Sequence, residues 1–429
     1  MKYVIFGGGP CGMRLADELS KKGENVELYE EKEKLGGCWK AEWKDGYFIE
    51  HAPRVMTTNY ERVIDLVDSL NLKDPYNDVY GSRFNATKMF IKYTLSNLSF
   101  LDIAKFTMTM WSISLEDPRT VQEWMDGNNI TTKGKKAISN LSISLATVPD
   151  DLSAYCFFDA IYQGFGKGKF IQFREGDMWL KKWEARIRSR KNVKIYKNCK
   201  LTGLVSENGK IKYAKTQKGR VNGDVFICSF PLWNLQELMK NCDADIKNNW
   251  LPEKQFIDFC KNSSYTAIGI QLHFSKKMEL EMSWCQTCMG EWSIILLETS
   301  KYQENFTKKK GIREVWSCAL VDFATKSETT GKKPGKMTYE EIGLEVLNQL
   351  EKTLNRKLKP KMITVNVDFN RKGKWEPRES AYASTPFGTL PAKGKKISNL
   401  YSVGCQNRYE IAVLDGAIGA ADKFISSYA

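Results

Sequence analysis

The sequence feature that most constrains the fold lies at the start of the chain, where a short apolar run leads into a glycine-rich turn. Residues 3–6 read Tyr-Val-Ile-Phe, which is typical of a buried parallel strand. The glycines that follow, Gly7, Gly9 and Gly12, have the spacing G-x-G-x-x-G. In such a turn the first glycine permits a tight bend and the second lets the backbone approach a pyrophosphate. The third lets a helix pack closely on the strand.

The residues after this turn supply the other parts of a dinucleotide site. A helix is expected over residues 10–22, and the amides of its first turn, which contains Pro10 and Cys11, point at the phosphates. Glu30 ends the second strand, eighteen residues after Gly12, where a carboxylate accepts hydrogen bonds from ribose hydroxyls. The alternative is a glycine-rich turn without a ligand. Because the strand, the helix and the acid all stand where the mechanism needs them, the sequence favours a dinucleotide site.

A second glycine pair follows Glu30, and NAD binding does not require it. The segment consists of Gly36, Gly37, Cys38 and Trp39. It resembles the extended motif E-x-x-x-R-x-G-G-R or G-G-x-W of FAD proteins. These form the superfamily of flavin-containing amine oxidases, protoporphyrinogen oxidases and phytoene desaturases. Lys34 stands at the place of the arginine. The resemblance implies that the segment contacts FAD, and we expect FAD to be bound non-covalently.

Residues 45–56 resemble the strand that leads the backbone up to the flavin ring in this superfamily. By that resemblance Pro53, Arg54 and Val55 lie near the isoalloxazine, and Arg54 offsets negative charge on the reduced ring. An ordinary surface arginine is the alternative. His51 falls where the flavin edge is expected, which makes it the candidate acid or base. A hydrogen-bonding core histidine is the alternative there.

Two later segments also resemble the superfamily. Residues 170–178 resemble the point where the chain re-enters the FAD domain, and Leu201 corresponds to the residue whose backbone meets adenine. Residues 399–426 resemble the closing motif, whose helix begins against the flavin and the pyrophosphate. The FAD contacts expected there are Gly404, Cys405, Val413 and Leu414. Cys405 replaces the usual acidic residue.

The resemblance implies an α/β fold, in which an FAD-binding Rossmann-like, doubly wound domain carries an inserted α+β substrate-binding domain. The FAD-binding domain is expected at residues 1–72, 170–245 and 392–429. The substrate-binding domain is expected at residues 73–169 and 246–391. A chain of 429 residues is long enough for two such cores.

Elements between these motifs follow from local patterns. Apolar residues at helical spacing predict an amphipathic helix over residues 60–72. Asn208-Gly209 predicts a hairpin turn, with residues 223–231 as the return strand of a β-meander. Thr338 and Glu341 form a capping-box pattern that opens a helix.

Composition excludes several classes of protein. The net charge is +14, but 50 of the 65 basic residues are lysines, whereas arginine is the usual residue for contacts to guanine and phosphate. We therefore expect no nucleic-acid partner, although attraction to anionic substrates or membrane surfaces stays open. No run reaches about 18 apolar residues, so no transmembrane segment is expected. The first strand begins at residue 3 and leaves no room for a signal peptide, which predicts a cytoplasmic protein.

The eleven cysteines are odd in number and scattered, which indicates reduced thiols in such a compartment. Cys285 and Cys288 form the one C-x-x-C pair. Zinc needs four ligands, and the nearest histidine, His273, lies twelve residues upstream of the pair. We therefore expect no metal site.

Two departures from the superfamily argue against a standard amine oxidase. Many amine oxidases carry a lysine that holds a water near flavin N5, and this chain has Gly269 at that place. An aromatic residue that guides the amine over the ring corresponds to Val413. The substrate pocket is expected to be mostly apolar and aromatic. Its predicted lining is Gln271, His273, Trp292, Trp375 and Tyr382.

Four functions stay open from the sequence. The first two are FAD-dependent oxidoreductases that remove a hydride from a small organic substrate. One acts on an amine or amino acid, and the other on an apolar, desaturase-type substrate. The third is a non-redox flavoenzyme of the sugar-mutase type, and the fourth is a non-catalytic protein that keeps a dinucleotide fold. The sequence names neither the electron acceptor nor the oligomeric state.

Overall fold

The structure is a computed structural model of the chain. It describes residues 1–79, 90–92, 94–114, 116–145, 148–162, 168–278, 286–306, 309–366, 368–369, 375–376, 380–382, 389–407 and 413–429.

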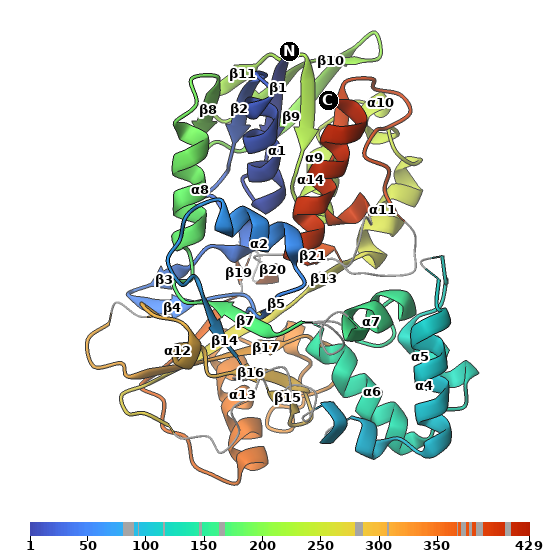
Figure 1. Cartoon of the computed structure of the whole chain (residues 1–429), viewed down its shortest axis with the longest axis vertical. Coiled ribbons are helices and arrows are strands. Elements are labelled where there is room, and N and C mark those ends of the chain that lie inside the picture. Colours follow the sequence, from blue (N-terminus) through green and yellow to red (C-terminus); the bar gives the residue numbers. More distant parts are fainter. Residues whose placement is uncertain are drawn as a thin grey trace.

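A parallel sheet of five strands forms the upper part of the molecule, in the order β22-β12-β1-β2-β8 (Figure 1). The strands are β1 (Lys2–Phe6), β2 (Asn25–Tyr29), β8 (Val193–Tyr196), β12 (Val225–Cys228) and β22 (Leu400–Ser402). Every neighbouring pair is parallel, with Tyr3 opposite both Val26 and Val225. The sheet therefore joins segments from both ends and the middle of the chain.

Both faces of this sheet are buried, as a doubly wound fold requires. Tyr3 and Ile5 face a core that they share with four helices. These helices are α1 (Pro10–Lys21), α2 (Glu61–Asp68), α8 (Met178–Arg188) and α14 (Leu414–Tyr428). Val4 and Phe6 face the opposite core, which is built with the meander strands and with α9 (Leu232–Met239) and α11 (Glu253–Asn262). The continuous apolar run of β1 follows from this two-sided burial.

The expected meander exists, but the predicted return strand was wrong. The meander consists of β9 (Leu201–Glu207), β10 (Lys210–Thr216) and β11 (Gly219–Val221). Residues 225–228 instead form β12, which pairs in parallel with β1. The reason is burial: the four residues of β12 are apolar and largely buried, whereas β10 alternates between buried and exposed residues.

A second, antiparallel sheet lies in the lower part, in the order β15-β16-β17-β14-β18 (Figure 1). Its strands are β14 (Ile268–Phe274), β15 (Gln286–Met289), β16 (Ile294–Leu297), β17 (Glu314–Leu320) and β18 (Met362–Asn366). Ile268, Ile270 and Leu272 face a core shared with α13 (Tyr339–Leu354), which begins at the predicted Thr338 capping box. The alternate residues of β14 face the segment around Glu50.

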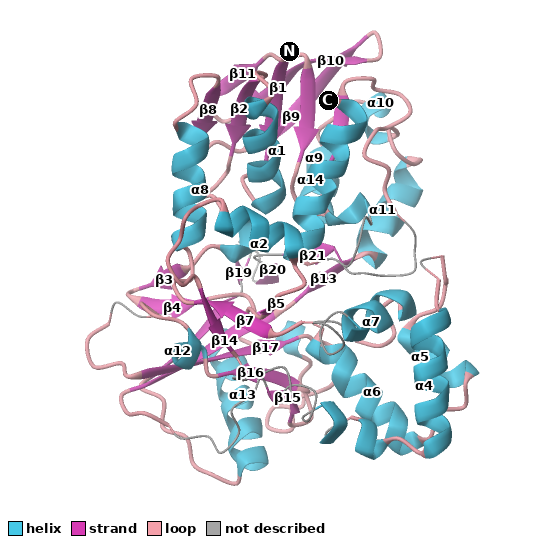
Figure 2. Ribbon diagram, in the orientation of Figure 1, coloured by secondary structure: helices cyan, strands magenta, loops and turns pink. Residues whose placement is uncertain are grey.

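A group of helices lies beside the antiparallel sheet (Figure 2), and Ile143 of this group packs with Ile295 and Ala319 of that sheet. The helices are α4 (Phe100–Ser112), α5 (Val121–Gly127), α6 (Thr132–Ser144) and α7 (Ala154–Ile161). They share a core rich in aromatic side chains, in which Phe106 contacts both Trp124 and Phe158. We call this group of four the helical unit.

Short elements connect these parts. The strands are β3 (Glu42–Lys44), β4 (Tyr47–Ile49), β5 (Met56–Thr57), β6 (Tyr76–Asp78), β7 (Phe170–Phe173), β13 (Ser264–Thr266), β19 (Asp368–Phe369), β20 (Trp375–Glu376) and β21 (Ser380–Tyr382). The helices are α9 (Leu232–Met239), α10 (Ala244–Lys247), α11 (Glu253–Asn262) and α12 (Thr299–Tyr302). Short 3₁₀ helices cover Gly37–Trp39, Leu95–Asn97, Pro334–Lys336 and Cys405–Asn407.

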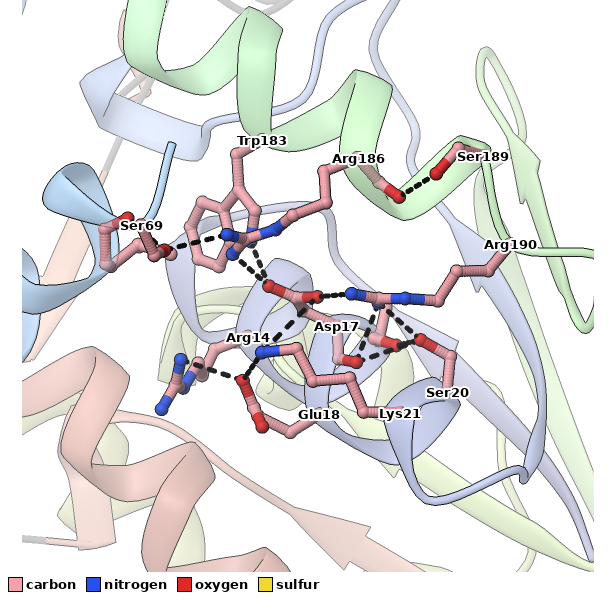
Figure 3. A network of polar contacts seen from close by, with 12 residues as sticks. Arg14, Asp17, Glu18, Ser20, Lys21, Ser69, Trp183, Arg186, Ser189 and Arg190 are labelled. Carbon is pink, nitrogen blue, oxygen red and sulfur yellow. Dashed lines mark hydrogen bonds and ion pairs between the residues drawn. The ribbon is translucent and has the colours of Figure 1, made fainter. Parts of the chain in front are cut away.

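A buried carboxylate fixes α1 against α8 (Figure 3). Asp17 is fully buried and accepts a hydrogen bond from Trp183 Nε1 (2.7 Å). It also pairs with the guanidinium groups of Arg186 and Arg190. Burial alone would raise the pKa of Asp17, but these donors hold it below the usual value. The helix that carries the glycine-rich turn is therefore anchored by a charged pair as well as by apolar packing.

The predicted fold class is confirmed, since the chain is mixed α/β with a parallel central sheet. The strands of that sheet come from the three ranges expected for the first domain. The domain boundaries themselves stay a prediction. In the described part of the chain, no helix combines the length and the apolar character needed to cross a membrane.

Candidate functional site

The first glycine-rich turn is shaped by close backbone packing. A Cβ atom at Gly7 would lie 2.2 Å from the carbonyl oxygen of Ser229, and the φ of Gly7 is 105°. A Cβ atom at Gly12 would lie 1.9 Å from the carbonyl oxygen of Gly7. The protein itself therefore requires glycine at these two positions.

Gly9 differs, because the protein does not fill the space beside it. A Cβ atom at Gly9 would meet nothing closer than the Cα of Gly37, at 3.9 Å. Gly9 also precedes α1 as its N-cap, and no side chain of the described residues caps that helix end. The first amides of α1 are thus left for another partner, and open space lies beside the turn. A pyrophosphate fits this arrangement.

The second glycine pair lies directly against the first turn. The N–H of Gly36 donates to the carbonyl oxygen of Gly8 (2.8 Å). A Cβ atom at Gly37 would lie 3.2 Å from the Cα of Gly9. Trp39 follows and packs edge-on against Phe173 and Trp179. The structure therefore brings Gly7, Gly9, Gly12, Gly36 and Gly37 together, as the resemblance implies.

Glu30 lies beside the first turn. Its carboxylate is buried and accepts hydrogen bonds from the backbone N–H of Gly8 (2.7 Å) and of Lys32 (2.9 Å). Burial raises the pKa of Glu30 although these two donors lower it. Lys34, by contrast, directs its ammonium group at the carbonyl oxygen of Ala41 (3.4 Å) and lies 5.1 Å from the Trp43 ring. Lys34 therefore stabilises the segment that follows the turn.

Two cysteine thiols lie beside this turn. Cys11 Sγ donates to the carbonyl oxygen of Val403 (3.5 Å), and Cys405 Sγ donates to that of Val413 (3.8 Å). The pKa of both thiols is raised to about 12, mainly by burial, and the proximity of Cys11 and Cys38 contributes to the rise for Cys405. Both thiols are therefore neutral at physiological pH. Cys405 adds no negative charge at a place where the superfamily has an acid.

The C-terminal segment reaches the same region through β22 and α14. Gly404 donates its N–H to Asn407 Oδ1 (2.9 Å). Val413 is the N-cap of α14, and no described side chain caps that helix end either. Leu414 is buried in the core that includes α1. Leu201 is half-buried against the opposite core, so its backbone rather than its side chain is the candidate contact.

The segment before Arg54 lies between the second glycine turn and β14. The Arg54 guanidinium donates to the carbonyl oxygens of Trp39 (2.9 Å) and Lys40 (3.0 Å). Its Nε lies 3.4 Å from Glu50 Oε2, and the Glu50 side chain is fully buried. Arg54 is thus a partly buried, engaged group, with its side chain 9% exposed, and not the ordinary surface arginine that the sequence left open. Pro53 and His51 are half-buried in the same segment, and Val55 packs against Val79 and its neighbours.

The other side of this segment packs on β14. A Cβ atom at Gly269 would lie 1.7 Å from the carbonyl oxygen of Glu50, so no side chain fits there. Gln271 Nε2 donates to the same oxygen (2.9 Å). His273 Nε2 lies 3.3 Å from Thr364 Oγ1, and burial lowers the pKa of His273 to about 4. His273 is therefore a neutral core residue near physiological pH.

The predicted pocket lining is only partly described. Trp292 packs in the core on the α13 side of the sheet, opposite to Gln271, so the prediction that it lines the pocket was wrong. The side chains of Trp375 and Tyr382 lie outside the described ones, as does Cys285 of the C-x-x-C pair. One cavity, of about 540 Å³, lies in the helical unit and contains none of the predicted site residues.

Sequence reasoning missed Glu50 and Lys40. Lys40 is buried, and its ammonium group donates to the carbonyl oxygen of Gly37 (2.9 Å) and lies 3.2 Å from Glu42. A signal for Glu50 exists, because a glutamate four residues before Arg54 is within reach of an ion pair. The role of Glu50 becomes visible only when the contacts of both residues are known.

Comparison with known proteins agrees with this geometry. A family model described as an NAD(P)-binding Rossmann-like domain matches residues 5–70. No curated protein matches the chain. Solved structures match it over nearly its full length.

Three of these structures are oxidases or candidate oxidases. A candidate protoporphyrinogen oxidase from Exiguobacterium sp. 255-15 is 17% identical, with 99% of this chain and 98% of that chain covered and a TM-score of 0.62. A putrescine oxidase with putrescine bound is 13% identical, with 99% and 98% covered and a TM-score of 0.64. Cyclohexylamine oxidase from Brevibacterium oxydans IH-35A is 12% identical, with 99% and 98% covered and a TM-score of 0.64. At such identities the likeness shows the fold alone, and it agrees with the fold that the resemblance predicts.

Proposed function

We propose that this chain is an FAD-dependent oxidoreductase that removes a hydride from a carbon atom of a small organic substrate. The observation that carries the proposal is the meeting of two glycine turns at the uncapped start of α1. The space beside Gly9 is open there, whereas the space beside Gly7 and Gly12 is closed by the protein. A structural turn alone does not explain this difference.

The chain's own groups would hold FAD through its phosphates, ribose and ring. The amides at the start of α1 would bind the pyrophosphate, and Glu30 would accept a ribose hydroxyl. The further contacts that we propose are Pro10, Cys11, Lys34, Gly36, Gly37, Cys38, Trp39, Pro53, Arg54, Val55, Leu201, Gly404, Cys405, Val413 and Leu414. When bound, FAD supplies a ring that accepts the hydride.

The surrounding residues would position the cofactor and move protons. Arg54 ties the second glycine turn to the Glu50 segment, because it donates to Trp39 and Lys40 while it faces Glu50. The neutral thiols of Cys11 and Cys405 avoid repulsion with the phosphates. His51, in the same segment, is the candidate acid or base. Since Gly269 has no room for a side chain, no protein amine stands at that position.

An amine is the substrate class that we favour over an apolar one. The support is that two matching structures carry the names putrescine oxidase and cyclohexylamine oxidase. The test is anaerobic mixing of the FAD-loaded protein with a panel of amines, amino acids and apolar alkenes. Loss of the visible flavin absorption with an amine supports the proposal. Two results together would indicate a mutase instead of an oxidoreductase. No member of the panel would reduce the flavin, and the protein would rearrange a sugar nucleotide only after chemical reduction of the flavin.

A further inference from the structure

The outer surface of α4 exposes large apolar side chains. The exposed fractions are 84% for Phe100, 65% for Leu101, 71% for Met108 and 71% for Trp111. All four belong to one helix of the helical unit, and Figure 1 shows α4 at the outer edge of that unit. Single exposed apolar residues are common on proteins, but four on one helix form a patch that calls for a partner.

These residues share one face of the helix. At 3.6 residues per turn, positions 100, 101, 104, 108 and 111 fall within an arc of about 100°. The arc consists of Phe100, Leu101, Ala104, Met108 and Trp111 and contains no charged residue. We call this arc the α4 face.

The fold does not need the α4 face for its own core. The opposite side of α4 already supplies Phe106, which is buried against Phe158 with ring centroids 4.9 Å apart. Asp102 lies on that side too, where it accepts hydrogen bonds from the backbone N–H (3.2 Å) and the hydroxyl (2.6 Å) of Thr131. On the other side Trp111 touches the ring of Tyr162 edge-on, with ring centroids 5.8 Å apart, and is still 71% exposed. Among the described residues, helix α4 is thus apolar on two sides and packed mainly on one.

The size of the patch decides whether a second copy of the chain or a lipid surface covers it. Aromatic side chains present about 200 Å² each, so the α4 face offers on the order of 600 Å². Stable dimers bury about 800 Å² on each partner, and a single convex helix falls short of that area. A lipid surface needs no matching shape, and helices with phenylalanine, tryptophan and leucine on one face lie in the bilayer interface.

Charge favours an anionic lipid surface. The chain carries a net charge of +14. Exposed Lys133 and Lys136 stand at the start of α6. The contact of Thr131 with Asp102 holds this helix end beside the start of α4, on the side away from the α4 face, so these lysines add positive charge near the inserting helix without belonging to its apolar face. Lysines near an inserted apolar face attract anionic headgroups.

We propose that the α4 face inserts into the interface of an anionic membrane and anchors the protein there without spanning it. Phe100 and Trp111 enter the boundary between headgroups and acyl chains, and the lysines at the start of α6 add to the attraction between the positively charged chain and the anionic headgroups. This anchoring does not depend on the proposed oxidoreductase function.

The test is sedimentation of the purified full chain with vesicles. One set of vesicles contains phosphatidylcholine alone, and the other contains phosphatidylcholine with about a third phosphatidylserine. The variant Phe100→Ser with Trp111→Ser removes the two most exposed aromatic residues of the α4 face. The matched control is Trp233→Ser, which removes an exposed tryptophan from α9. Circular dichroism checks that each variant is folded.

We expect the wild type and the control to bind the anionic vesicles, and the double variant to bind at least tenfold more weakly. Absence of wild-type binding to both kinds of vesicle would overturn the proposal. Equal binding of the double variant would do so as well, because charge alone would then hold the protein. A concentration-dependent dimer that the double variant abolishes, without vesicle binding, would assign the α4 face to a second copy instead.

Discussion

Replacing Gly9 with alanine separates a ligand site from a structural turn. The new Cβ atom would lie 3.9 Å from the nearest protein atom, and the φ of Gly9 is −71°, which alanine adopts freely. The folded protein without cofactor should therefore be as stable as the wild type or slightly more so, because alanine restricts the unfolded chain.

Cofactor affinity should fall in the same variant. The methyl group would occupy the space through which a phosphate approaches the backbone. The loss of one charged hydrogen bond costs about 1.5–3 kcal/mol, which corresponds to roughly a tenfold to 150-fold weaker affinity. The assay is titration of the cofactor-free protein with FAD, followed by flavin fluorescence, together with urea unfolding.

The matched control is Gly127→Ala, at the end of α5. A Cβ atom there meets nothing within 4 Å, and the position is remote in the fold from the glycine turns. The control should keep wild-type affinity. If Gly9→Ala also binds FAD like the wild type, while its unfolding curve shows a folded protein, the space beside Gly9 is not the phosphate site.

Four further predictions follow from named contacts. Glu30→Ala should weaken FAD binding about tenfold or more in the same titration, since a charged hydrogen-bond acceptor is lost. Asp17→Asn should lower the free energy of unfolding by about 3 kcal/mol in urea, because Arg186 and Arg190 lose their buried partner. Glu18→Gln, in an exposed pair of the same helix, should cost under about 1 kcal/mol. Because the pKa of Asp17 in the folded state is below its usual 3.8, the contribution of Asp17 to the free energy of unfolding is complete above about pH 3.8. It should be lost as the pH falls through the folded pKa, so that wild type and Asp17→Asn converge in acid. Gly269→Ala should destabilise the protein by more than about 3 kcal/mol, measured by thermal unfolding, since its Cβ would overlap the Glu50 carbonyl. Chemically reduced FAD-loaded protein should react slowly with oxygen in stopped-flow mixing, because no protein amine stands at position 269.

Each of these has a contrary outcome. Unchanged affinity in Glu30→Ala would mean that another residue binds the ribose. Equal stability losses in Asp17→Asn and Glu18→Gln would show that burial does not strengthen the Asp17 pairs. A fully stable Gly269→Ala would show that β14 lies farther from Glu50. Reoxidation as fast as in a vigorous oxidase would favour a standard amine oxidase and contradict the argument from Gly269.

The parts of the fold that were predictable depend on local chemistry. The apolar run of β1, the glycines of the first turn and the acid at Glu30 each restrict backbone or charge within a few residues. The Thr338 capping box is equally local and is confirmed. Such signals located the candidate site because the site is built from backbone turns.

The parts that were not predictable depend on packing between distant segments. Gly269 is glycine because the carbonyl of Glu50, 219 positions earlier in the sequence, approaches it. Arg54 and Trp292 lie outside the strands, and the surroundings of each side chain follow from the segments that pack around it. Nothing in the nearby sequence fixes that packing. Residues 225–228 have the pattern of any apolar strand. Their parallel direction follows only from their pairing with β1 in the folded chain.

The central claim is that the chain binds FAD through the two glycine turns. The most direct measurement is an absorption spectrum of the purified protein, followed by acid precipitation and mass analysis of the released cofactor. We predict a yellow protein that releases a species with the mass of FAD into the supernatant. A colourless protein that takes up no added FAD, or one that releases only a nicotinamide dinucleotide, would contradict the claim.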